Sequence, residues 1–172
     1  MIRILGIDPG SRITGYGIID SNGRRSRHVA SGCIRVTGDT LPERLGMIFH
    51  EVGAVLGEHM TGEGAMEMAI ENVFVSKNAS SALKLGQARG AAICAGVSHA
   101  LTVAEYTPTE VKLAIVGTGG ADKAQVQHMV RMLLGLKGPL QADTADALAV
   151  ALCHAHTGST LARVPALSGR RR

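Results

Sequence analysis

The sequence of 172 residues is poor in aromatic side chains: it contains no tryptophan, two tyrosines and two phenylalanines. A chain of this length can bury a core as a single domain, and that core must then consist of aliphatic residues and alanine. Hydrophobic residues make up 45% of the chain and charged residues 19%, which is typical of a globular protein and not of a disordered one. We therefore expect one globular domain with an aliphatic core.

Cysteines and long hydrophobic runs are also scarce. Cys33, Cys94 and Cys153 are odd in number, far apart and without CxxC spacing, so we predict buried reduced thiols and neither disulfides nor a zinc site. The longest run without a charged residue, 147–162, is short for a membrane span, and the N-terminus lacks a secretory signal pattern. These absences predict a soluble cytoplasmic protein with no membrane partner.

The net charge of +4 is weak support for nucleic-acid binding, because four arginines after residue 162 account for it. The distribution of charged residues along the chain is more informative than the net charge. No acidic residue lies between Glu71 and Glu105, while Lys77, Lys84 and Arg89 do. This stretch is either a local positive surface that contacts phosphates or a solvated helix face with a few basic residues.

Hydrophobic periodicity and turn residues predict an alternating order of strands and helices. Expected strands are 2–8, 13–20, about 27–36, one that ends at Glu71, and 101–106; expected helices begin at Leu41 and at the cap Asn78, and cover about 108–115, 122–135 and 143–156. The first three strands form an antiparallel meander, and later strands join the first in parallel through right-handed crossovers. We assign 1–157 to this α/β domain and 158–172 to a disordered basic tail.

Acidic residues stand at the ends of two predicted strands. Asp8 ends the first strand just before the turn Pro9-Gly10, and Glu71 ends the fourth. If the two strands are neighbours, both carboxylates lie at the sheet edge where open α/β sheets place their sites. Asp143 and Asp146 follow at i and i+3 on one face of the last helix, although Asp143 can also be interpreted as a simple helix cap.

Four carboxylates in one pocket repel one another unless cations neutralise them, and oxygen ligands of this kind suit Mg²⁺ or Mn²⁺. The chemistry that such a cluster indicates is phosphodiester hydrolysis assisted by two metal ions, with water as the nucleophile.

Four long motifs in one order then make a specific resemblance: GIDPGSRITGYGIID, AIENVFVSKNASSALKLGQARG, YTPTEVKLAIVGTGGADKAQVQHMV and QADTADALAVALCHAH. Together they resemble the bacterial RuvC family of Holliday junction resolvases over residues 1–157. The resemblance implies a ribonuclease-H-like fold, which we expect to be a mixed five-stranded sheet with helices on both faces. It also implies a homodimeric endonuclease that depends on divalent metal, Mg²⁺ with Mn²⁺ as a substitute. Such an enzyme nicks two opposing strands of a four-way junction symmetrically in recombination and repair, with a preference for a short thymine-rich sequence.

The resemblance carries catalytic metal ligation onto Asp8, Glu71, Asp143 and Asp146. It matches Phe74 to an aromatic residue that contacts junction bases, although a core phenylalanine is the alternative, and it matches Lys112 and Lys123 to basic residues near the DNA backbone. Lys77, Lys84 and Arg89 are further candidates for phosphate contacts.

The resemblance also implies partners: a second copy of the chain, and the RuvA and RuvB branch-migration machinery at the nucleoid. The family's dimer contact falls near helix 78–98, where small residues recur every four positions at Ala82, Gly86, Gly90 and Cys94. Such a stripe allows close approach of another backbone, either of the same fold or of a second subunit.

Three alternatives to a resolvase belong to different functional classes. The opening GIDPG also resembles the first phosphate loop of actin-like ATPases and sugar kinases, but those need two such lobes and this chain has room for one. A junction-binding module without catalysis would leave the acids structural. A related single-domain nuclease acting on RNA is the third alternative, and competition between junction and linear substrates separates it from a resolvase.

Overall fold

The computed structural model describes residues 1–60, 65–72 and 78–161, the last three of these by their backbone alone. The elements follow the chain as β1 (Ile2–Asp8), β2 (Ile13–Ser21), β3 (Ser26–Arg35), α1 (Leu41–His59), β4 (Met66–Glu71), α2 (Ala79–Ser98), β5 (Thr102–Tyr106), α3 (Pro108–Val116), α4 (Lys123–Leu134) and α5 (Ala142–Leu161). Every strand and helix expected from the sequence is present, and Asn78 caps α2 through its side chain.

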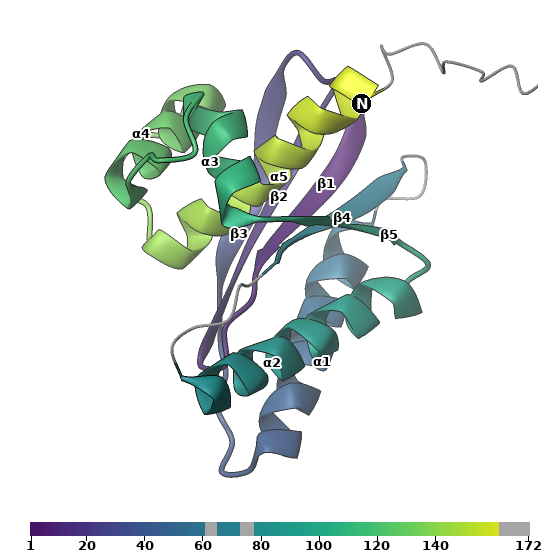
Figure 1. Ribbon diagram of the computed structural model, residues 1–172. Helices are drawn as coiled ribbons and strands as arrows, with labels where there is room; N and C mark the ends of the chain where they lie inside the picture. Colours follow the sequence, from purple (N-terminus) through teal and green to yellow (C-terminus); the bar gives the residue numbers. More distant parts are fainter. Residues whose placement is uncertain (61–64, 73–77, 162–172) are drawn as a thin grey trace, which may run out of the picture.

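The strands form one sheet in the order β3-β2-β1-β4-β5. β1, β2 and β3 are antiparallel neighbours, whereas β1, β4 and β5 run parallel. Helices α1 and α2 cover one face of the sheet, and α3, α4 and α5 cover the other (Figure 1). The prediction of a mixed five-stranded sheet with helices on both faces is confirmed.

The core lies in two hydrophobic clusters, one on each face of the sheet. The largest fully buried side chains of the described residues are all isoleucine, leucine, valine or methionine, which confirms the aliphatic core expected from the scarcity of aromatic residues. The expectation of three buried thiols is wrong for Cys94, which is exposed on α2, while Cys153 is buried and Cys33 is half-buried.

Helix α5 packs closely against the sheet at two glycines, Gly6 of β1 and Gly17 of β2. A Cβ atom on Gly6 would lie 2.1 Å from the main-chain oxygen of Ala147, and one on Gly17 would lie 2.6 Å from Leu148 Cδ2. A larger residue at Gly6 would therefore push the helix outward. The helix also continues to Leu161, five residues beyond its expected end at 156, and it contains no proline. Residues 162–172 of the expected tail lie outside the described residues.

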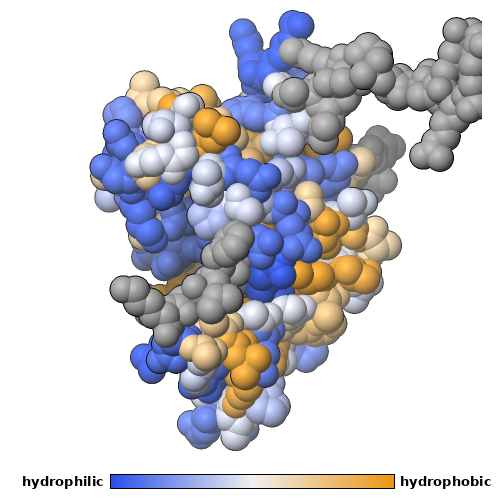
Figure 2. Space-filling model, in the orientation of Figure 1, coloured by the Kyte–Doolittle hydropathy of each residue, from blue (hydrophilic) through white to orange (hydrophobic). Residues whose placement is uncertain are grey.

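The surface of α2 is apolar for a solvent-facing helix. Leu83 and Val97 are 64% and 59% exposed, and a Cβ atom added at Gly86 or Gly90 would meet no other atom within 4 Å. Figure 2 shows hydrophobic side chains along the side of the molecule that carries this helix. No helix of the described ranges is both long and apolar enough to cross a bilayer.

Candidate active site

The sheet brings Asp8 and Glu71 to one edge. β1 and β4 pair in parallel up to Ile7 and Ile70, so the next residue on each strand is the acid. Both acids are half-buried. The parallel register thus produces the side-by-side placement that was expected from the two strand ends.

The first turn of α5 carries the other two acids to the same region. Thr144 is buried, and its Oγ1 atom lies 3.2 Å from Cys33 Sγ on β3. On β2, a Cβ atom at Gly15 would lie 2.1 Å from the main-chain oxygen of Asp143. The helix therefore begins directly against two strands, and Asp143 is its second residue, inside the first turn and not at the cap.

The pKa values of Asp8 and Glu71 show that these two acids feel the charges of their neighbours. Burial, followed by the charges of Glu71, Asp146 and Asp143, raises the pKa of Asp8 to about 7. Burial and then Asp146 raise the pKa of Glu71, against the opposing charges of Lys123 and Lys112. The four acids thus form a single electrostatic cluster that is costly to ionise fully in the absence of cations.

Two lysines border this cluster. The Nζ atom of Lys123 lies 3.2 Å from Asp146 Oδ2, and Asp146 raises the pKa of the lysine. Lys123 is the first residue of α4, whose start is fixed by a capping box between Asp122 and Gln125. A hollow of about 240 Å³ lies between the acids and lysines and is lined by Glu71, Pro108, Val111, Lys112, Lys123, Val126, Asp146 and Ala149.

The donor set of the acid cluster fits a hard divalent cation. Carboxylate oxygens are the ligands that Mg²⁺ and Mn²⁺ prefer. Burial and then the charges of the neighbouring acids raise the pKa of Asp8, and a bound cation would offset both effects. Within the part of the chain that the structure describes, no three acid, histidine or cysteine side chains are already close enough together to hold a metal ion. Ligation of a cation by these acids would therefore require their side chains to turn towards it.

The remaining predicted DNA contacts differ in their surroundings. Lys84 is exposed on α2, and Lys112 is half-buried on α3. Arg89 has partners within the protein: its Nε atom donates to the main-chain oxygen of Glu71 at 3.2 Å, and its guanidinium forms an ion pair with Glu105. Phe74 and Lys77 lie outside the described residues.

Sequence reasoning missed two residues beside the cluster. Glu105, on β5, pairs with Arg89, although the two residues are sixteen positions apart. Arg35, at the end of β3, lines a second hollow of about 240 Å³ together with Asp143. A basic residue at a strand end was the only local signal for Arg35, and the sequence offered none for the pairing of Glu105.

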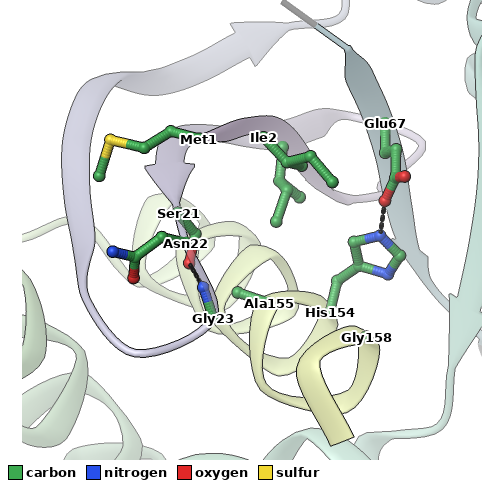
Figure 3. Close-up of a pocket in the computed structure, with 10 residues that line it drawn as sticks. Met1, Ile2, Ser21, Asn22, Gly23, Glu67, His154, Ala155 and Gly158 are labelled. Atoms are coloured by element: carbon green, nitrogen blue, oxygen red, sulfur yellow. Dashed lines mark hydrogen bonds and ion pairs between the residues drawn. The ribbon is translucent and has the colours of Figure 1, made fainter. Parts of the chain in front are cut away.

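A larger hollow, of about 380 Å³, lies at the opposite end of β1, beside Met1 and Ile2 (Figure 3). Its main polar groups satisfy each other: His154 Nε2 lies 2.6 Å from Glu67 Oε2, and His154 Nδ1 lies 2.8 Å from the hydroxyl of Tyr106. His154 was not expected to bind metal, and here it joins α5 to β4 and β5. This hollow is remote from Asp8 and is not the candidate active site.

Comparison with known proteins places this architecture in a family. The family model of the crossover junction endodeoxyribonuclease RuvC matches residues 4–154. RuvC of Methylococcus capsulatus is 59% identical over 164 residues, which cover 95% of this chain and 96% of the relative. RuvC of Marinobacter nauticus is 55% identical over 170 residues, which cover 99% of this chain and 95% of the relative. The structure of Thermus thermophilus RuvC in complex with a Holliday junction substrate superposes with a TM-score of 0.85 at 33% identity, and the match covers 93% of this chain and 96% of the Thermus chain. This chain therefore belongs to the RuvC family of crossover junction endodeoxyribonucleases and has its ribonuclease-H-like fold.

Proposed function

We propose that this protein is a resolvase, an endonuclease that recognises four-way DNA junctions and nicks two opposing strands symmetrically in recombination and repair. The observation that carries the proposal is the coupled cluster of four carboxylates at the ends of β1 and β4 and the start of α5. Membership of the RuvC family supplies the substrate class, because relatives that match nearly the whole chain carry this activity in their names.

Asp8, Glu71, Asp143 and Asp146 are the residues that would hold divalent metal, in our proposal two Mg²⁺ ions with Mn²⁺ as a substitute. When bound, such ions supply an activated water and stabilise the leaving oxygen of the phosphodiester. The protein's own part is to hold the oxygen ligands on three rigid elements. Lys123 and Lys112 compensate the negative charge that the phosphate adds to the site.

DNA binding in this proposal combines backbone and base contacts. Lys84, Lys112 and Lys123 contact phosphates, together with Lys77, and these contacts make binding depend steeply on salt. Phe74 follows Glu71 by three residues, and we propose that it stacks on an opened base of the junction.

Symmetric cutting requires two active sites, and we propose a homodimer that uses the apolar surface of α2. Leu83 and Val97 would lose exposed area there, and Gly86 and Gly90 leave room for a second backbone. We further propose that the dimer works in the cytoplasm, at the nucleoid, with the RuvA and RuvB branch-migration proteins.

The decisive experiment offers the protein a mobile four-way junction and a linear duplex of matched sequence, each with Mg²⁺ and with chelator. Paired nicks on the junction alone, dependent on metal, are expected. The variant Asp8→Asn is expected to abolish cutting while junction binding and dimerisation remain. Binding without cutting by the unmodified protein would favour a junction-binding module, and cutting of RNA in preference to the junction would favour the RNA nuclease alternative.

A further inference from the structure

The side chain of Arg89 is held inside the protein at the end of β4. It reaches from α2 to the main-chain oxygen of Glu71, to which its Nε atom donates at 3.2 Å. Its Nη2 atom pairs with the carboxylate of Glu105 on β5. The arginine side chain is 18% exposed and that of Glu105 is 51% exposed, so the bond to Glu71 is shielded from water whereas the ion pair forms at the surface.

These contacts meet at the point where β4 loses support from β1. The pairing of β1 with β4 ends at Ile70, whereas Glu71 still pairs with Tyr106 of β5, and the main-chain nitrogen of Asn72 donates to Tyr106 at 2.7 Å. Arg89 therefore supplies a hydrogen bond to the first residue of β4 beyond the β1 ladder. The fork of donors on a guanidinium suits this task, because it can bond a carbonyl and a carboxylate at once.

We propose that Arg89 and Glu105 are positioning residues that fix the Glu71 carboxylate for the reaction, and that Arg89 does not serve as a phosphate contact. The proposal rests on the catalytic role of Glu71 proposed above. Glu105 matters as much as Arg89, because it neutralises and orients the guanidinium that bonds Glu71.

The predicted consequences fall on catalysis and metal binding. Arg89→Gln and Glu105→Gln should each lower the single-turnover cleavage rate and the affinity for Mn²⁺ by about 10–100-fold, as is usual when a group that orients a metal ligand is removed. Mn²⁺ binding is measured without DNA, by electron paramagnetic resonance. Junction affinity in chelator, and its salt dependence, should stay unchanged for both variants. The double variant should be no worse than the poorer single variant, because the two residues act as one unit.

If Arg89 were a phosphate contact, substitutions at Arg89 and Glu105 would change junction affinity in opposite directions. Arg89→Gln would then weaken junction binding and reduce the salt slope by about one. Glu105→Gln would strengthen binding, because it frees the guanidinium and removes a negative charge. Either of these binding changes, or unchanged Mn²⁺ affinity in both variants, would overturn the proposal.

A matched control is Arg27→Gln on β3, which removes an exposed arginine from its ion pair with Asp20; cleavage and Mn²⁺ affinity should both stay normal. Thermal unfolding of each variant shows whether it is folded at the assay temperature, and Arg89→Lys is the fallback if Arg89→Gln is not. Asp8→Asn is measured in parallel. If Asp8→Asn cuts normally, the proposed active site is wrong. If Asp8→Asn does not cut while Arg89→Gln and Glu105→Gln cut normally, only the positioning role is refuted.

Discussion

Lys123 and Asp146 form an ion pair of 3.2 Å between the start of α4 and the first turns of α5. The ammonium group thus occupies part of the acid cluster, where burial and the neighbouring acids raise the pKa of Asp8 and Glu71 and the lysine's charge opposes that rise. A divalent cation bound by Asp146 would compete with this lysine and release it towards the phosphate.

The variant Lys123→Met should separate these two roles. We expect Mn²⁺ to bind at least as tightly as before, because a competing cation is gone. We expect cleavage at saturating metal to slow by about 100-fold, since a charge that compensates the reacting phosphate is lost. Lys137→Met, at an exposed position between α4 and α5, is the control. Weaker Mn²⁺ binding by Lys123→Met would mean that the lysine organises the acids instead.

The acid cluster should make the metal-free protein less stable as pH rises. The pKa of Asp8 is about 7 in the folded state against 3.8 as its ordinary value, so the folded state binds more protons between these pH values. The free energy of unfolding therefore falls from about pH 4 to pH 7 on account of this group. Asp8→Asn in chelator should be more stable than the unmodified protein at pH 8, by about 2–4 kcal/mol, and this gain should vanish near pH 4. Urea unfolding at the two pH values measures it, and equal stability at pH 8 would contradict the raised pKa.

Gly15 should tolerate no side chain, because a Cβ atom there would meet the main chain of Asp143 at 2.1 Å. Gly15→Ala must displace the start of α5, and we expect a loss of about 2 kcal/mol in stability with a strong loss of cutting. Gly57→Ala on α1 is the matched control: no atom lies within 4 Å of the added methyl group, and we expect a gain of roughly 0.5–1 kcal/mol. Normal cutting by Gly15→Ala would show that the acids do not depend on this contact.

Phe74→Ala tests the base-stacking role. Cutting of the junction should be poor while Mn²⁺ binding remains, because the acids are untouched and the contact to an opened base is lost. Cleavage kinetics with the same junction and metal titration measure both quantities. Normal cutting would remove the stacking role.

Most of the fold could be predicted because its signals are local. Short apolar runs bounded by turn residues mark β1 and β2, and a capping residue precedes α2 at Asn78. The placement of Asp8 beside Glu71 needed one further rule, that parallel neighbours end at the same sheet edge. These signals lie within a few residues of the elements that they predict.

The features that the sequence did not reveal are contacts between distant positions. Arg89 was read as a phosphate contact because no acid is near it along the chain, yet β5 brings Glu105 against it. The link from His154 to Glu67 spans 87 positions. Such pairs depend on which strand lies beside which helix, and residue spacing carries no information about that.

The scarcity of aromatic residues has a consequence for the fluorescence of the protein, and Tyr106 is the residue concerned. Without tryptophan, the near-ultraviolet emission of the protein arises from its two tyrosines, Tyr16 and Tyr106. Tyr106 pairs in register with Glu71, and its hydroxyl bonds to His154, which lines the hollow at the other end of β1. Structural changes at the acid cluster or at His154 should therefore alter the emission of Tyr106, which no tryptophan emission masks.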